Sequence, residues 1–319
     1  MAEIPTLVVR KPCFDLPTGC PQCLSAYIYL NFAKIPFQLN FHLNHPHSDK
    51  IPYFEIGDDY VLYDNENEGI IQCLRKNGGV VDLDSEVSSL PEWITIKAVI
   101  TTWLHDALVY ELWLGSKGSP AYSIYYSDLP WPIGKVLSSK KVRLVKLKHG
   151  ITDDNAVAKE EEIYERANSA YDALSKLLGE KNYLFGNRPS SLDAIFLAHG
   201  LVALQALPES STLRIKFLEH DNLVRYVQKC KTELIEAGPQ IHTDASSSGF
   251  RIPSTQKGDK FKSAPRREKT DEEKRFKRKG RYFVAAQLVA VAVFLTLMIS
   301  FDFAEVEVEN VDDQGFQGE

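Results

Sequence analysis

Two cysteines beside a predicted helix start are the residues of this sequence best suited to chemistry. Cys20 and Cys23 are separated by two residues and follow the short apolar segment 6–10, which predicts a strand. The positive end of a helix stabilises a thiolate, so this spacing is typical of dithiol redox sites. Cys23 also opens a long apolar run, where a cysteine is often just a small buried side chain. Two interpretations of the pair stay open, thiol chemistry and core packing.

Pro52 is the nearest further candidate for this thiol site. It follows Ile51 directly before a predicted strand, where a cis proline would present backbone groups to the helix start. A trans proline opening an edge strand is the alternative. Nine residues separate Arg10 from Cys20, and we expect no Lys or Arg side chain to reach the thiols. The sequence therefore predicts no second group at this site that would hold a substrate.

Three histidines lie close together after the second predicted strand. His42, His45 and His47 could in principle join Cys20 and Cys23 around a metal ion. Their spacing matches no standard set of metal ligands, and histidines in polar loops are usually solvated. We therefore expect no metal site and no bound cofactor.

The sequence from Ser190 to Asp193 reads Ser-Ser-Leu-Asp, the pattern of a helix capping box. The Ser190 side chain would accept from the Asp193 amide, and the Asp193 carboxylate would reach back to the Ser190 N–H. The helix that follows, 190–207, is apolar on most faces and should be buried. Ser190 and Asp193 are therefore predicted to be a structural cap rather than catalytic residues.

Composition and missing motifs exclude several classes of protein. The chain has 319 residues, of which 44% are hydrophobic and 25% charged, and a formal net charge of −6, which is ordinary for a folded body. Five cysteines are too few, and odd in number, for a secreted disulfide scaffold. No P-loop, G-x-S-x-G, H-E-x-x-H or dinucleotide-binding fingerprint is present. The N-terminal residues show no signal-peptide pattern, so we expect the folded body in a reducing, cytosol-facing compartment.

Near the C-terminus, 282–301 is an uncharged apolar stretch long enough to cross a bilayer as a helix. A basic cluster precedes it, and an acidic segment without Lys or Arg follows it; the cluster contains Arg275, Lys277, Arg278, Lys279 and Arg281. By the positive-inside rule, we expect 1–281 in the cytosol and 302–319 across the membrane. The basic cluster lies beside this predicted anchor, which favours attraction to anionic lipid over RNA binding.

The periodicity of the remaining sequence predicts an α/β half followed by an all-α half. The first elements follow the order β-α-β-β-β-α, at 6–10, 24–33, 37–43, 53–56, 60–62 and 66–76. From residue 91 the periodicity is helical, at 91–114, 155–178, 190–207 and 214–237. The intervening 115–133 is rich in Gly, Ser, Pro and Tyr and reads as a loop.

We therefore expect two folded domains and three further segments. The domains are 1–80, which is α/β, and 81–237, which is all-helical. A basic flexible linker, a transmembrane helix and an acidic tail should follow, at 238–281, 282–301 and 302–319.

Two segments carry a resemblance to the metaxins, a family with a glutathione-transferase-like fold. They are 15–27, with DLP leading to CLSAY, and 183–194, which reads YLFGNRPSSLDA. The sequence resembles the plant branch, over roughly 5–235 and the apolar segment. This resemblance implies an N-terminal thioredoxin-like β-α-β-β-α domain and a C-terminal helical domain. In transferases of this fold, Glu66 and Asn67 would lie where the γ-glutamyl group of glutathione is held.

The resemblance also implies a function. Metaxins are non-enzymatic, single-pass proteins of the mitochondrial outer membrane, with the folded body in the cytosol and the tail in the intermembrane space. The implied role is protein import and β-barrel sorting and assembly. The implied partners are a β-barrel assembly protein of that membrane, other metaxin-like subunits, β-barrel precursors and the membrane itself, without nucleic acid. The alternative is a membrane-tethered glutathione-dependent transferase or thiol oxidoreductase that uses Cys20 and Cys23.

Overall fold

The computed structural model describes residues 4–42, 50–56, 60–63 and 82–236. These residues belong to a compact unit that spans Met1–Ser246. The predicted linker, membrane segment and acidic tail, 238–281, 282–301 and 302–319, lie outside the described residues, as does the predicted helix 66–76. Within the described ranges, no helix combines the length and the hydropathy needed to cross a bilayer.

A four-stranded sheet forms the N-terminal part of the unit. The strands are β1 (Thr6–Val9), β2 (Gln38–Phe41), β3 (Tyr53–Ile56) and β4 (Tyr60–Tyr63), in the spatial order β2-β1-β3-β4. β1 pairs in parallel with β2 and antiparallel with β3, and β3 pairs antiparallel with β4. Helix α1 (Pro21–Phe32) connects the two parallel strands. The predicted order β-α-β-β-β is confirmed, because alternating apolar residues and turn residues specify short strands.

A long interrupted helix begins the all-helical part. It consists of α3 (Pro91–Val99), the π-helical turn η1 (Ile100–Leu104), α4 (His105–Tyr110) and the π-helical turn η2 (Glu111–Gly115). Pro91 stands at the first helical position, where its missing N–H has no intrahelical role. This span agrees with the helix predicted at 91–114.

Further helices complete the described chain. They are α5 (Ser119–Tyr125), α6 (Ile133–Lys148), α7 (Ala156–Leu178), α8 (Ser191–Gln205), α9 (Thr212–Leu218), α10 (Asp221–Lys231) and the π-helical turn η3 (Thr232–Glu236). The helices predicted at 155–178 and 190–207 are confirmed by α7 and α8. The helical region predicted at 214–237 is occupied by most of α9, which begins two residues earlier, and by α10 and η3.

The prediction of a loop at 115–133 is wrong, because this segment contains α5. The segment is rich in turn-forming residues, but it also carries Tyr125 and Tyr126, which pack α5 against Trp113 of η2. The Trp113 ring stacks on Tyr125 with centroids 5.4 Å apart and meets Tyr126 edge-on at 5.9 Å. Aromatic pairs at these distances stabilise beyond the area they bury. Tertiary packing therefore outweighs the local preference for a loop.

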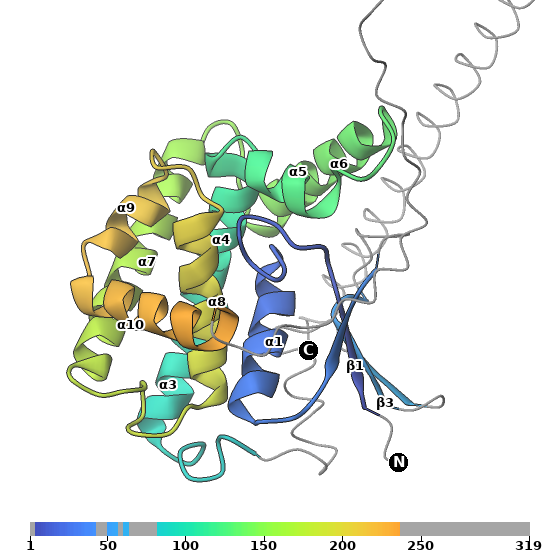
Figure 1. Ribbon diagram of the computed structural model, residues 1–319. Coiled ribbons are helices and arrows are strands. Elements are labelled where there is room, and N and C mark those ends of the chain that lie inside the picture. Colours follow the sequence, from blue (N-terminus) through green and yellow to red (C-terminus); the bar gives the residue numbers. More distant parts are fainter. Residues whose placement is uncertain (1–3, 43–49, 57–59, 64–81, 237–319) are drawn as a thin grey trace, which may run out of the picture. The chain divides into compact units, whose positions relative to one another are not determined.

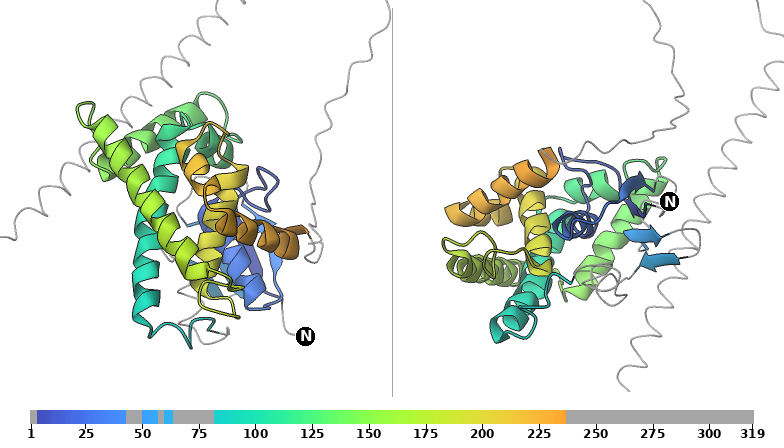
Figure 2. Two further views of the ribbon diagram at one scale, coloured as in Figure 1. Left: turned by 90° about the vertical axis from the view of Figure 1, so that its left-hand side faces the viewer. Right: turned by 60° about the horizontal axis from the view of Figure 1, so that its bottom comes forward.

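Helix α8 is the centre of the core. Figures 1 and 2 show α1 between the sheet and α8, with α7, α9 and α10 on the other side of α8. α8 buries residues around its whole circumference, including Leu192, Phe196 and Val202. Where α8 approaches its neighbours most closely it carries Gly200; a Cβ there would lie 2.6 Å from Val227 and 3.2 Å from Phe217. The backbone of α8 thus packs directly against side chains from α9 and α10.

Candidate functional site

The candidate dithiol lies at the N-terminus of α1. Cys20 is the N-cap residue, Pro21 takes the first helical position, and Cys23 lies in the first turn. Both cysteines have 0% of their surface exposed. The local sequence explains this placement, since proline favours the first turn and the apolar residues that follow must be buried. The two sulfur atoms thus meet inside the protein rather than at its surface.

Arg10 brings a positive charge to both sulfurs. It directly follows β1 and is only 3% exposed. Its Nη1 donates to Cys20 Sγ at 3.1 Å, to Cys23 Sγ at 3.7 Å and to the carbonyl of Ile51 at 3.0 Å. The expectation that no Lys or Arg reaches the thiols is therefore wrong. α1 connects the parallel strands β1 and β2, so its first turn lies beside the end of β1. Arg10 therefore lies close to Cys20 although nine residues separate them along the chain.

Tyr125 contributes a second hydrogen bond to one sulfur only. Its hydroxyl donates to Cys20 Sγ at 3.6 Å, and the Arg10 guanidinium carbon lies 4.8 Å from the centre of its ring. A cation over an aromatic face is attracted by the ring's electron density. α5 therefore closes the site that β1 and α1 begin, and Cys20 receives more donors than Cys23.

These contacts separate the acidities of the two thiols. Burial by itself would raise the pKa of Cys20, but hydrogen bonding to Cys23, the charge of Arg10 and the Tyr125 hydroxyl outweigh it and hold the pKa well below its ordinary value. Burial raises the pKa of Cys23, and the neighbouring Cys20 raises it further. The arrangement therefore favours a thiolate on Cys20 and a retained proton on Cys23.

The other residues predicted for the thiol site have different outcomes. Pro52 is buried, and its peptide bond with Ile51 is cis, directly before β3. The Ile51 carbonyl accepts from Arg10, which brings this segment to the dithiol. Glu66 and Asn67 lie outside the described residues.

The histidines considered as metal ligands, and rejected, also have different outcomes. His42 is half-buried and packs edge-on against Tyr53, whereas His45 and His47 lie outside the described residues. In the described part of the chain, no three His, Cys, Asp or Glu side chains gather as a metal site would require.

The capping box expected at Ser190 and Asp193 is present at the start of α8. The Ser190 N–H and hydroxyl donate to Asp193 Oδ2 at 2.8 and 2.6 Å. The Leu184 N–H and the Tyr226 hydroxyl donate to Oδ1 at 2.9 and 2.6 Å. Asp193 is fully buried; burial raises its pKa, while the donors from Leu184, Ser190 and Tyr226 partly oppose the rise. The carboxylate thus joins α8, the loop before it and α10.

Asp84 is a second buried acid at the same helix start, and the sequence analysis missed it. Its carboxylate accepts from the Ser191 N–H at 2.8 Å and from the Ser191 hydroxyl at 2.5 Å. The residue lies in a turn-rich segment before α3, where an aspartate is usually solvated. Asp84 and Ser191 are 107 residues apart in the chain, so no local sequence pattern predicts the hydrogen bond between them. The two acids together satisfy the first amide groups of α8.

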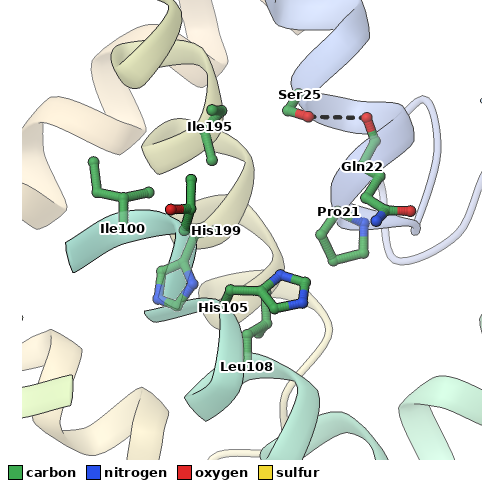
Figure 3. Close-up of a pocket in the computed structure, with 9 residues that line it drawn as sticks. Pro21, Gln22, Ser25, Ile100, His105, Leu108, Ile195 and His199 are labelled. Carbon is green, nitrogen blue, oxygen red and sulfur yellow. Dashed lines mark hydrogen bonds between the residues drawn. The ribbon is translucent and has the colours of Figure 1, made fainter. Parts of the chain in front are cut away.

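A small pocket lies beside the first turn of α1, as Figure 3 shows. Pro21, Gln22 and Ser25 on α1 face His105 on α4 and His199 on α8 across it. Burial lowers the pKa of His199 to about 3, and burial together with the charge of Lys148 lowers that of His105. Both imidazoles are therefore neutral near pH 7. The sequence analysis did not identify this pocket, because its histidines come from helices far apart in the chain.

Family profiles match both parts of this architecture. The profile of the glutathione S-transferase N-terminal domain matches 21–118, and that of the glutathione S-transferase C-terminal domain matches 167–230. Among solved structures, a glutathione transferase from Phanerochaete chrysosporium aligns with a TM-score of 0.47 at 13% identity, covering 72% of this chain and 97% of that one.

Characterised relatives carry metaxin names. The "Mitochondrial outer membrane import complex protein METAXIN" of Arabidopsis thaliana is 50% identical over 313 residues, which is 97% of each chain. Mouse Metaxin-1 is 24% identical over 67% of this chain and 69% of its own length, and human Metaxin-2 is 22% identical over 67% and 81%. The chain therefore belongs to the metaxin family and resembles its plant members.

Proposed function

We propose that this chain is a non-enzymatic component of the machinery that imports proteins at the mitochondrial outer membrane and assembles β-barrel proteins there. The observation that supports this most is the 50% identity, over 97% of both chains, with a plant protein named for an outer-membrane import complex. An identity that extends beyond the fold-forming residues favours a shared role. The proposed partners are a β-barrel assembly protein, other metaxin-like subunits and β-barrel precursors.

The proposed location is the outer mitochondrial membrane, with the folded body in the cytosol and the C-terminal tail in the intermembrane space. The support is the apolar segment 282–301 and the basic residues before it. Protease added to intact mitochondria should then remove the folded body. Survival of that body until the outer membrane is ruptured would contradict this topology.

The role itself is tested by affinity purification of the tagged full chain from detergent-solubilised mitochondria. We expect an outer-membrane β-barrel assembly protein to co-elute, and we expect depletion of the chain to lower β-barrel levels in that membrane. An unrelated tail-anchored protein, tagged in the same way, controls for detergent carry-over. Normal β-barrel levels after depletion, together with no co-elution, would overturn the proposal.

A glutathione-dependent enzyme is the second candidate, and Arg10 beside the two thiols is the observation that favours it. The burial of both sulfurs argues against it, because a glutathione conjugate must reach the attacking sulfur in line. Two measurements separate the candidates: glutathione binding to the purified chain, and rescue of a deletion strain by the double variant Cys20→Ser, Cys23→Ser. Under the import proposal, glutathione does not bind and the double variant restores β-barrel levels. Loss of rescue with the variant folded and abundant would favour the enzyme.

A further inference from the structure

The contacts around the dithiol distinguish its two sulfurs. Cys20 Sγ accepts from Arg10 at 3.1 Å and from the Tyr125 hydroxyl at 3.6 Å, whereas the Arg10 contact to Cys23 is longer, at 3.7 Å. Hydrogen bonds and a nearby cation stabilise a thiolate more than a thiol. The geometry therefore makes Cys20 the nucleophile and leaves Cys23, one helical turn later, as the thiol that can react with it next.

Burial restricts what this nucleophile can attack. Cys20 and Cys23 have no exposed surface, and Arg10 is 3% exposed. Thiol–disulfide exchange needs the incoming disulfide in line with the attacking sulfur, which a tripeptide or a protein cannot achieve here without local opening. A hydroperoxide with two heavy atoms also needs some local opening to reach Cys20 Sγ, but a much smaller one than a tripeptide or a protein needs.

We propose that Cys20 and Cys23 form a peroxide-reactive dithiol that reduces small hydroperoxides and closes to a disulfide. The Cys20 thiolate attacks one peroxide oxygen, the O–O bond breaks, and hydroxide leaves while Cys20 becomes a sulfenic acid. Cys23 then attacks the Cys20 sulfur, which forms the S–S bond, and its proton leaves with the sulfenic oxygen as water. Two thiol sulfurs are oxidised by two electrons in total, and both peroxide oxygens end as hydroxide or water.

Two other cysteines of the chain serve as internal controls. Cys13 is half-buried, and its pKa is raised by burial. Cys230 is buried on α10, where burial and the nearby charge of Glu233 raise its pKa to about 12. Neither should react with peroxide at the rate of Cys20. Because the reaction concerns the dithiol alone, it does not depend on the proposed role in import.

The test uses the reduced full chain in detergent, treated with hydrogen peroxide, then labelled with N-ethylmaleimide and digested with trypsin. Cleavage after Arg10 and Lys34 releases one peptide that holds Cys13, Cys20 and Cys23. We expect this peptide to change from three labels to one label and an internal disulfide, with the remaining label on Cys13. Oxidation of Cys20 should be about tenfold or more faster than that of Cys13.

Single variants test the order of the steps. Cys23→Ser should trap a sulfenic acid on Cys20, detected by dimedone, whereas Cys20→Ser should leave Cys23 unreactive on the same timescale. Tyr125→Phe should slow the first step several-fold because it removes a donor to the thiolate. Tyr126→Phe is the matched control. It also removes one hydroxyl from a ring that packs on Trp113, so it tests for general damage to this aromatic cluster.

The proposal fails on any of three results. Equal oxidation rates of Cys20 and Cys13 would show that the buried cation does not activate the site. A sulfenic acid on Cys23 in the Cys20→Ser variant, formed as fast as that on Cys20, would reverse or abolish the assigned roles. A disulfide between Cys13 and either partner would show that the reaction proceeds from a rearranged chain rather than from the native pairing of Cys20 and Cys23. None of these results bears on co-elution with a β-barrel assembly protein.

Discussion

His199 on α8 is a buried base that couples folding to pH. Its Nε2 lies 2.6 Å from the Tyr171 hydroxyl, and burial lowers its pKa to about 3. Between pH 6.5 and about 3 the unfolded chain binds a proton that the folded chain does not, so stability falls as the pH falls. The loss attributable to His199 should be roughly 2 kcal/mol at pH 5.

The measurement is urea unfolding at pH 7.5 and pH 5 for the parent chain and His199→Gln. On acidification to pH 5, the Gln variant should lose about 2 kcal/mol less stability than the parent chain. Tyr171→Phe is the matched control: it removes the partner hydroxyl but keeps the imidazole buried, so the acid sensitivity should persist. Equal acid sensitivity in the parent and His199→Gln would mean that other groups control it.

Asp193 should contribute much more to stability than its capping partner Ser190. Asp193→Ala leaves buried donors from Leu184, Ser190 and Tyr226 without an acceptor, which should cost about 3 kcal/mol or more. Ser190→Ala removes one hydroxyl from the cap and should cost about 1 kcal/mol. Equilibrium denaturation of both variants decides this, and equal costs would show that the bonds from Leu184 and Tyr226 to Asp193 add nothing beyond the cap.

At the scale of the secondary-structure elements, the contact between α8 and α10 leaves no space for a methyl group. Gly200→Ala places a Cβ 2.6 Å from Val227 Cγ2, so it should destabilise the fold by about 1–3 kcal/mol. Alanine favours helices over glycine by up to about 1 kcal/mol, and the expected sign is therefore opposite to the helix propensity. A double-mutant cycle with Val227→Ala should show a compensating interaction, because the second change removes the clash. Additive effects of the two substitutions would place the strain elsewhere.

Patterns within a few residues predicted what local geometry controls. The two cysteines at a helix start and the Ser-x-x-Asp cap are each defined by residues within four positions of one another, and both positions follow from the sequence. Tyr125 and Asp84 act on partners 105 and 107 residues away, so no spacing in the sequence reveals them. Arg10 is only ten residues from Cys20, but it reaches the sulfur because β1 aligns with the start of α1. The activating groups of the site thus come from tertiary structure.

At the scale of the whole molecule, the compact unit Met1–Ser246 should fold without the rest of the chain. A chain that ends at Ser246 should therefore unfold cooperatively in urea and stay in solution without detergent. A chain that ends at Leu207 is the matched control. It loses α9 and α10, which supply the buried Phe217 and Val227 and the Tyr226 hydroxyl that binds Asp193, so it should not fold. An aggregated or molten Ser246 chain would show that residues beyond it are required.

The long sequence distance between Asp84 and Ser191 has a consequence during synthesis. A ribosome that adds about 5–20 residues per second needs roughly 5–20 s to make the 107 residues that separate the two partners. During that interval α1 exists without α8, the helix that covers it in the finished protein. Leu24 and Ile28, which are fully buried in the folded protein, should then be more exposed on the nascent chain. Chaperones that bind apolar segments will therefore meet the N-terminal half first, and variants that delay the docking of α8 should extend that contact.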